Sequence, residues 1–185
     1  MDVVQRIQQI LDKIQQYEST VDKSIIKVNT RFSLTAKEII KKKIPLNVLG
    51  CTGVAKLFVY YANEVGLDCD VVFTANKNDL KKRLKDKISR INGHQLISVI
   101  DDGKKLIFDP RKLKLERINL DNFVHAGTVH IFTGIVTGKD IEKIDSVEKI
   151  EEIYLKGYKN KFIKNGVKKL QNLDTSNEIL NKLRE

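Results

Sequence analysis

Apolar residues recur at helical spacing at the start of the chain, and Gln, Lys and Asp occupy the opposite side. This pattern predicts an amphipathic helix whose apolar stripe covers a hydrophobic core. A second helix is expected from Thr35 up to Pro45, because proline interrupts a helix. The first stripe comprises Val4, Ile7, Ile10, Leu11, Ile14 and Tyr17.

Residues 52–65 form a third predicted helix, and apolar side chains cover an unusually wide part of its surface. Such a helix is typical of the buried centre of a fold. Gly66 ends the pattern, and Cys51 stands directly before it. The apolar positions are Val54, Ala55, Leu57, Phe58, Val59, Tyr61, Ala62 and Val65.

Two runs rich in Ile, Val, Leu and Phe, residues 94–100 and 105–109, predict neighbouring strands. Asp102-Gly103 between them is a strong signal for a two-residue hairpin loop. Side chains alternate between the faces of a strand, so this register puts His94 and Asp109 on one face. They are then diagonal neighbours, roughly 7–8 Å apart between backbone positions.

The other segments complete an α+β pattern. We expect a small antiparallel sheet packed on the helix that follows Cys51, with extra helices at both ends of the chain. Further strands are expected at 69–74, 115–118 and 128–136. Further helices are expected at 80–91 with Asp79 as N-cap, at 140–144, 146–158 and 161–173, and after Thr175.

Length and composition indicate a globular protein of 185 residues, of which 41% are hydrophobic. Its two well-separated cysteines offer no disulfide framework and indicate a reducing compartment. The first residues lack the features of a signal peptide, and no segment is long enough to span a bilayer. We therefore expect a cytoplasmic protein with no membrane partner.

The net charge of +10 raises the question of nucleic-acid binding. The lysines are dispersed over many predicted helices and interleave with 24 acidic residues. No nucleic-acid-binding motif or aromatic platform accompanies them. Nucleic acid is therefore not an expected partner, whereas a basic rim could steer an acidic peptide substrate toward a cleft.

Cys51, His94 and Asp109 supply the three groups that thiol catalysis needs: a nucleophile, a base and a carboxylate that orients the base. Cys51 would lie at a helix N-terminus, where the helix dipole lowers the pKa of a thiol. Backbone N–H groups there could also hold the oxyanion formed during attack on a carbonyl.

The local motifs around these residues are Gly50-Cys51-Thr52-Gly53, Gly93-His94 and Phe108-Asp109-Pro110. Together they resemble the core of the transglutaminase-like cysteine-enzyme superfamily, over residues 46–111. The resemblance implies a papain-like arrangement with Cys51 as nucleophile, His94 as general base and acid, and Asp109 as the orienting acceptor. Among the compact members of this superfamily, the chain resembles the vasohibin-like cysteine peptidases. Because they can replace the third carboxylate, a backbone carbonyl stays an alternative to the Asp109 side chain.

One departure from the superfamily concerns tryptophan. Many transglutaminases place tryptophan near the nucleophile and after the histidine, whereas this chain has none. The departure favours a hydrolase over a cross-linking enzyme. Asn47, Thr52 and Tyr17 are candidates for oxyanion or substrate binding, with ordinary surface or packing roles as the alternative.

The resemblance also sets the expected organisation of the chain. One domain covers residues 1–185, with N-terminal helices over 1–45, a catalytic core over 46–137 and C-terminal helices over 138–185.

His125 and His130 are the other two histidines. On one continuous strand their odd separation would put them on opposite faces, which disfavours joint ligation of a metal. A zinc site needs three or four ligands, and neither Cys-x-x-Cys nor His-Glu-x-x-His occurs. We therefore expect no metal and no other cofactor. Each histidine is expected to be structural, with lining of a substrate cleft as the alternative.

The sequence thus predicts a cysteine peptidase or related amide hydrolase that acts on a peptide or protein through an acyl-enzyme. Two alternatives stay open. One is a transglutaminase or deamidase acting on glutamine side chains, and the other is a non-catalytic basic binding module on the same fold.

Overall fold

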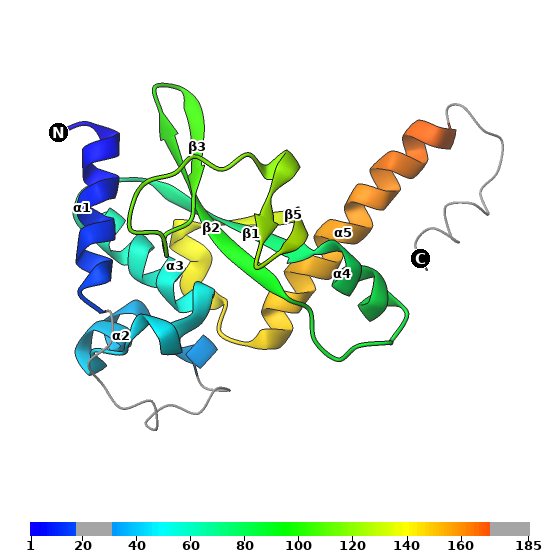
Figure 1. Cartoon of the computed structure of the whole chain (residues 1–185), viewed down its shortest axis with the longest axis horizontal. Coiled ribbons are helices and arrows are strands. Elements are labelled where there is room, and N and C mark those ends of the chain that lie inside the picture. The colour runs from blue at the N-terminus through cyan, green and yellow to red at the C-terminus, as the bar shows by residue number, and fades with distance from the viewer. Residues whose placement is uncertain (18–30, 171–185) are drawn as a thin grey trace.

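The computed structural model of the protein describes residues 1–17 and 31–170, with side chains up to residue 160 (Figure 1). Its α+β architecture agrees with the sequence pattern. The α-helices are α1 (Val3–Gln15), α2 (Ala36–Lys42), α3 (Leu46–Glu64), α4 (Lys77–Leu84) and α5 (Val147–Leu170). The strands are β1 (Cys69–Asn76), β2 (Gly93–Asp101), β3 (Lys104–Phe108), β4 (Val124–His125) and β5 (Thr128–Thr137). Short 3₁₀ helices are η2 (Arg31–Ser33), η3 (Leu120–Asn122) and η4 (Gly138–Lys143).

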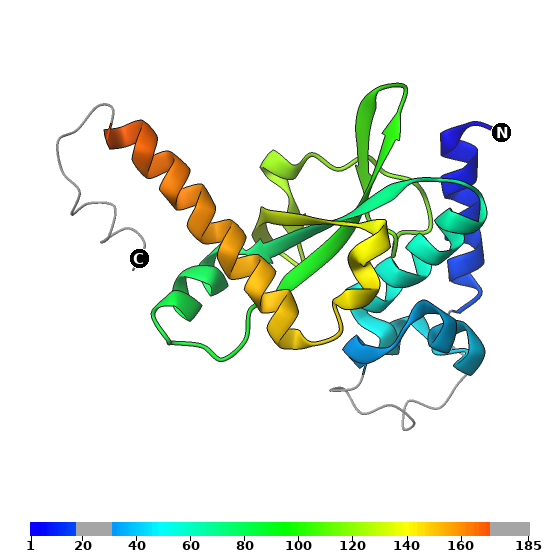
Figure 2. The same ribbon diagram turned by 180° about the vertical axis from the view of Figure 1, so that it is seen from behind.

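The strands form one antiparallel sheet in the order β3-β2-β1-β5-β4. Helices α3 and α5 cover the same face of this sheet, as the two opposite views show (Figures 1 and 2). Phe58 of α3 packs edge-on against Phe108 of β3, with ring centroids 5.3 Å apart. Tyr154 of α5 packs against Phe73 of β1 at 6.1 Å. These contacts place the main hydrophobic core between the two helices and the sheet.

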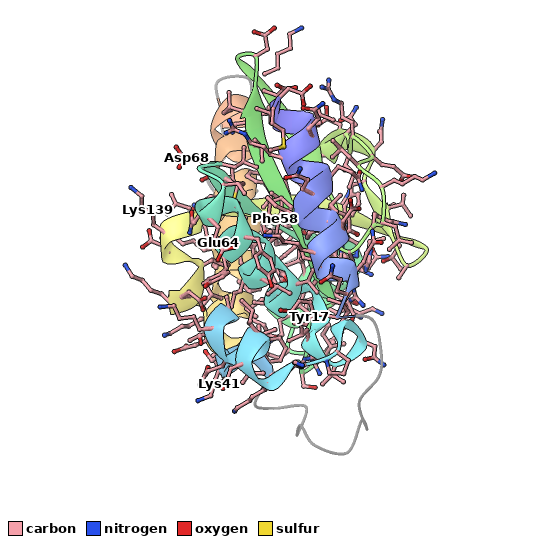
Figure 3. All side chains as sticks on the ribbon, turned by 90° about the vertical axis from the view of Figure 1, so that its left-hand side faces the viewer. Tyr17, Lys41, Phe58, Glu64, Asp68 and Lys139 are labelled. Carbon is pink, nitrogen blue, oxygen red and sulfur yellow. The ribbon has the colours of Figure 1, made fainter. Side chains whose placement is uncertain are left out.

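Helix α1 packs on α3 at the side of the molecule seen in Figure 3. A capping box at Asp2 and Gln5 begins the helix. Its apolar stripe faces the core as the sequence predicts, because the side chains of Ile7, Ile10, Leu11 and Ile14 are buried.

The β2–β3 hairpin has the register that the sequence predicts. Asp101 pairs with Lys104, and Ile97 pairs with Phe108. Asp102 and Gly103 form the loop with φ values of 47° and 73°, as a two-residue turn that follows the twist of the strands requires.

Gly50 divides α3 into a short first turn and a long buried helix. Its φ of 66° and ψ of −180° are not helical, and this conformation is accessible almost only to glycine. Cys51 therefore begins the long segment, one residue earlier than the pattern of apolar positions predicts. Because the thiol lies at the start of that segment, the local sequence correctly indicates a helix N-terminus.

Helix α4 begins after Asn76 rather than at the expected Asp79. The Asn76 side chain accepts hydrogen bonds from two backbone N–H groups of the first turn and so caps the helix. The helix ends at Leu84, and Asp86 beyond it takes a positive φ of 54°. The prediction of a helix over 80–91 is thus wrong at both ends, because capping and a left-handed turn decide its limits.

Four predictions after β3 also differ from the structure. Residues 115–118 form no strand, although the backbone N–H of Ile118 donates to Ile107 at 2.8 Å. This segment crosses the sheet face opposite α3 and adds a small apolar cluster there. One continuous helix, α5, replaces the two expected over 146–158 and 161–173, and the short 3₁₀ helix η4 replaces that at 140–144. The helix expected after Thr175 lies outside the described residues.

In the described residues, none of the helices has both the length and the apolar character needed to cross a membrane.

Candidate active site

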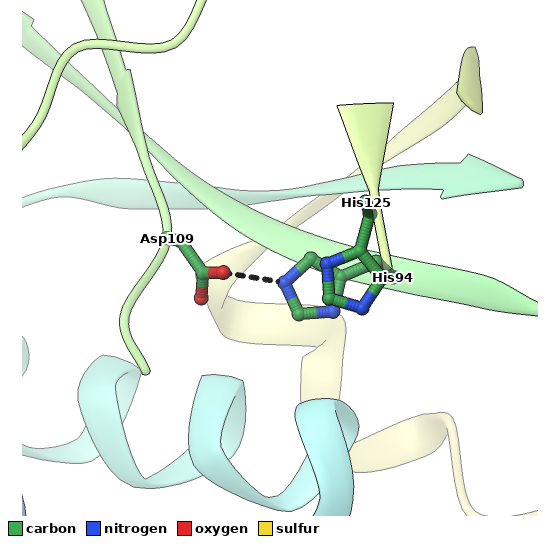
Figure 4. A group of neighbouring side chains, drawn as sticks. All are labelled: His94, Asp109 and His125. Carbon is green, nitrogen blue, oxygen red and sulfur yellow. Dashed lines mark hydrogen bonds and ion pairs between the residues drawn. The ribbon is translucent and has the colours of Figure 1, made fainter. Parts of the chain in front are cut away.

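His94 and Asp109 lie side by side at one end of the β2–β3 hairpin. His94 is the second residue of β2, and Asp109 directly follows β3. His94 Nε2 and Asp109 Oδ2 are 2.7 Å apart, and both side chains are buried (Figure 4). The shared face follows from the hairpin register, so strand alternation and the Asp-Gly loop are sufficient to bring these two residues together.

Cys51 approaches the same histidine from the start of the long segment of α3. The thiol and the His94 imidazole are close enough for each to shift the pKa of the other. Because Nε2 of His94 is engaged with Asp109, Nδ1 is the ring nitrogen left for the thiol. The three residues selected from the sequence thus form one connected group.

The charges of this group favour a thiolate beside an imidazolium. Burial alone would raise the pKa of the Cys51 thiol, but hydrogen bonding to His94 and the charge of its ring lower it below its ordinary value. Burial opposes a charge on His94 as well, but the hydrogen bonds and charges of Asp109 and Cys51 raise its pKa to about 9. Burial likewise acts against ionisation of Asp109, whereas the hydrogen bond with His94 lowers the pKa of that carboxyl. A low thiol pKa beside a cationic histidine is the condition for a nucleophilic cysteine.

Cys69, the second cysteine, has the opposite environment. It lies at the start of β1, where burial and the neighbouring charges of Asp70 and Asp68 raise the pKa of its thiol to about 12. It therefore stays protonated at neutral pH and is a poor nucleophile.

Gln95 and Tyr154 complete the surroundings of the thiol, and sequence reasoning missed both. Cys51 Sγ donates to Gln95 Oε1 at 2.6 Å, and the hydroxyl of Thr52 donates to the same oxygen at 2.9 Å. Gln95 Nε2 is 2.5 Å from the hydroxyl of Tyr154 on α5. Gln95 is completely buried on the core face of β2. A glutamine in an otherwise apolar strand face was the only sequence signal for this network.

Of the three candidates for oxyanion or substrate binding, only Thr52 lies in the site. Asn47 is exposed on the short turn before Gly50. The hydroxyl of Tyr17 pairs with that of Tyr61 at 2.8 Å, ten residues along the chain from Cys51. Tyr17 therefore contributes to packing between α1 and α3, which is the alternative considered for it.

His125 lies in β4 and His130 in β5. The prediction that they occupy opposite faces of one continuous strand is therefore wrong. Ala126 and Gly127, with φ values of 49° and 75°, turn the chain into the β4–β5 hairpin. The hairpin brings the two rings to a centroid distance of 5.4 Å. The His125 ring also stacks on His94 at 3.8 Å, with 9° between the planes (Figure 4).

His94, Asp109 and His125 each offer one metal-ligand atom, and these atoms lie within 4.8 Å of one another. The ring geometry does not suit a shared metal ion. The lone pairs of two stacked imidazoles lie in parallel planes rather than meeting at one point, and His94 Nε2 is already bonded to Asp109. The cluster instead fits a hydrogen-bonded pair of His94 and Asp109 with the His125 ring stacked on it. His125 is neutral, because burial and the charge of His94 lower its pKa.

A comparison with protein-family models, curated proteins and solved structures found no match. The resemblance to the transglutaminase-like superfamily therefore stays a prediction from the motifs around Cys51, His94 and Asp109. Function is inferred below from the geometry of the site.

Proposed function

We propose that the protein is a cysteine peptidase or related thiol amide hydrolase, with a papain-like arrangement of its catalytic groups. The observation that carries this proposal is the position of His94, which is hydrogen-bonded to Asp109 at 2.7 Å and close enough to the Cys51 thiol for each group to shift the pKa of the other. Nucleophile, base and orienting carboxylate in this order are the constellation used for nucleophilic acyl transfer. The substrate is a peptide or protein.

In the acylation step the Cys51 thiolate attacks the carbonyl carbon of a substrate amide, and a C–S bond forms. His94, as the imidazolium, donates its Nδ1 proton to the leaving nitrogen, and the C–N bond breaks. The amine leaves, and the acyl group stays on sulfur as a thioester. Asp109 holds the ring and stabilises its positive charge, because it accepts a hydrogen bond at Nε2.

In the second step a water molecule attacks the thioester carbonyl. Neutral His94 takes a proton from the water as the new C–O bond forms, and the C–S bond breaks. The carboxylic acid leaves, and the thiolate–imidazolium pair is restored.

Gln95 connects the thiol to α5 and controls which form of the sulfur is favoured. Its Oε1 accepts from the Cys51 thiol, and this carbonyl oxygen would repel a thiolate. Rotation of the amide by half a turn puts Nε2 at the sulfur and Oε1 at the Tyr154 hydroxyl. Tyr154 can donate to that oxygen, because burial and the charge of Cys51 raise the pKa of Tyr154 well above its ordinary value. In the rotated form the amide N–H stabilises the thiolate and reaches the oxyanion of a bound substrate.

Selective alkylation tests whether Cys51 is the nucleophile. At neutral pH iodoacetamide should modify Cys51 at least roughly 10-fold faster than Cys69, since the pKa shifts of the two thiols have opposite signs. His94→Ala should remove most of this preference. Lys104→Ala at the distant hairpin tip is the control and should leave it unchanged. Equal, slow alkylation of both cysteines in the wild type would overturn the proposal.

Reaction type is tested with a peptide library and with a glutamine-containing protein incubated with a labelled amine. Cleavage of peptide bonds that is lost in Cys51→Ser supports a peptidase. Incorporation of the amine without chain cleavage would show a transglutaminase instead.

A further inference from the structure

A cavity of about 220 Å³ opens beside the thiol on the core side of β2. Cys51, Gln95 and Tyr154 line one part of it, and Arg31 and Arg90 line another. Its volume is below the roughly 300–1,000 Å³ of pockets for drug-sized ligands. It therefore suits about one residue of a substrate rather than a long peptide segment.

Arg31 lies directly against the residue that precedes the nucleophile. Its guanidinium carbon is 3.5 Å from the position that a Cβ on Gly50 would take, and 4.7 Å from the centre of the Phe32 ring. Arg31 Nε is buried and has no hydrogen-bond partner in the part of the chain that the structure describes. A buried guanidinium N–H without an acceptor is costly, and a bound anion would satisfy it.

Lys56 holds the Arg31 segment in place. Its buried ammonium donates to the backbone carbonyl oxygens of Phe32 at 3.0 Å and of Leu34 at 3.2 Å. These bonds attach η2 and the residue after it to the middle of α3, at a lysine five residues beyond Cys51. The backbone directly after Arg31 is thus fixed to α3, so Arg31 is carried by an anchored segment rather than by a free surface loop.

Among the described residues that line the cavity, Glu151 is the one carboxylate, and it is already engaged. Glu151 Oε1 accepts from the backbone N–H of Ile91 at 3.1 Å, and its Oε2 lies 3.7 Å from Arg83 Nε. Arg90 at the mouth of the cavity is exposed. The cavity therefore presents positive charge next to the thiol without a neutralising partner for Arg31 among the described residues.

We propose that this cavity binds a carboxylate, held by the guanidinium of Arg31 with Arg90 at the entrance. That the carboxylate belongs to the substrate, at the residue next to the bond attacked by Cys51, rests on the proposed function. Planar guanidinium groups bind carboxylates through two parallel hydrogen bonds. The source is either an Asp or Glu side chain or the carboxylate at the end of a peptide.

Two alkylating reagents of similar size test the site without any need for hydrolysis. Iodoacetate carries the carboxylate that iodoacetamide lacks, and the free thiol 2-mercaptoethanol reports the intrinsic ratio of their rates. At Cys51 we expect the iodoacetate-to-iodoacetamide ratio to exceed the solution ratio by about 10-fold, as expected for one hydrogen-bonded charge pair. Arg31→Gln should return it to the solution value. Arg31→Lys keeps the charge but not the fork, and should retain part of the preference.

Arg6→Gln is the charge-matched control. Arg6 contacts the backbone at Val65, roughly 21 Å along α3 from Cys51, so its loss should leave the ratio unchanged. The same ratio in wild type, Arg31→Gln and Arg31→Lys would overturn the proposal. So would a fall in the ratio for Arg6→Gln as large as that for Arg31→Gln, because general charge would then explain the preference.

Matched peptides separate the two sources of the carboxylate. In peptides with amidated ends, faster cleavage beside Glu than beside Gln indicates that a side chain supplies the carboxylate. Faster cleavage of free-acid peptides than of amidated ones indicates that the end of the peptide supplies it. An iodoacetate preference without cleavage of any peptide would contradict the proposed function and leave the carboxylate site standing. Cleavage that is indifferent to both carboxylates would contradict the site alone.

Discussion

At Cys51, two neighbours act on the same proton in opposite senses. The carbonyl oxygen of Gln95, 2.6 Å from the sulfur, favours the thiol because it needs a donor. The His94 imidazole favours the thiolate, and so holds the pKa of Cys51 low. The reactivity of the cysteine therefore depends on the orientation of one amide as well as on the charge of the histidine.

Asp109→Asn tests the influence of His94 on the Cys51 thiol. The amide keeps the shape of the carboxyl but removes the negative charge that raises the pKa of His94 to about 9. We expect the rate of amide hydrolysis to fall by roughly 10²–10⁴-fold. In the proposed mechanism, loss of the His94 proton sets the high-pH limit of activity, so we expect the limit of the variant to lie below about 9.

The pH–rate profile of the purified variant measures this effect, and thermal unfolding controls for the fold. An unchanged high-pH limit would mean that a backbone carbonyl and not Asp109 orients the ring.

Tyr154→Phe tests the influence of the Gln95 amide on the thiol. Without the Tyr154 hydroxyl, the carbonyl oxygen of the rotated amide has no donor. The orientation that favours the protonated thiol therefore becomes more populated. One such hydrogen bond contributes about 1 kcal/mol, so the pKa of Cys51 should rise by somewhat less than one unit.

The pH dependence of alkylation at Cys51 gives this pKa. Tyr60→Phe, on a more exposed part of α3, is the control and should leave the midpoint in place. A midpoint that does not move in Tyr154→Phe would show that the Gln95 amide has no influence on the thiol.

Among the elements, α5 decides where Tyr154 lies. The helix crosses β5 at Gly157, and a Cβ at this position would collide with the backbone carbonyl of Thr133. Gly157 therefore allows the helix to approach the strand closely. Tyr154 is one turn earlier on the same helix, so the depth of this crossing also sets the contact between Tyr154 and Gln95.

Gly157→Ala should consequently affect both stability and chemistry. Overpacking against a rigid backbone costs about 1–3 kcal/mol, and thermal unfolding should show the corresponding loss. Alkylation of Cys51 should slow at the same time. Lys156→Ala, at the exposed neighbouring position, should change stability by less than about 0.5 kcal/mol. A Gly157→Ala variant as stable as the wild type would show that α5 does not press on β5.

For the whole molecule, the two faces of the sheet carry different groups of side chains. The face toward α3 and α5 carries the main core, whereas His94, His125 and His130 gather on the opposite side beside Phe123. His130 is buried there, and its Nδ1 is 3.2 Å from the hydroxyl of Thr74. Burial, with the charges of His125 and His94, lowers the pKa of His130 to about 4.

This shift predicts a loss of stability in mild acid. Between the ordinary pKa of 6.5 and about 4, the unfolded chain takes up a proton at His130 that the folded protein does not. The free energy of unfolding should therefore fall as the pH is lowered through this range. His130→Gln removes the titrating group, so its thermal midpoint should decline less between pH 6.5 and pH 4 than that of the wild type. An equal decline in both proteins would contradict the prediction.

Sequence reasoning was most successful where neighbouring residues carry the information. The amphipathic pattern of α1, the Asp102-Gly103 loop and the start of the buried helix at Cys51 follow from spacing and turn chemistry over a few residues. It was wrong where a single capping or left-handed residue changes an element, as at Asn76, Asp86 and the Ala126-Gly127 turn. Such residues are weak signals on their own, because many similar residues lie in ordinary loops.

By itself the sequence determined that His94 and Asp109 share a strand face and that Cys51 opens a helix, because hydrogen-bond register and helix geometry are local. Only the tertiary structure decided that Gln95, Tyr154, Arg31 and His125 surround this group. These four residues come from β2, α5, η2 and β4, and no local pattern specifies the distance between separate elements. That distance depends on how the elements pack, as at the close crossing of α5 over β5.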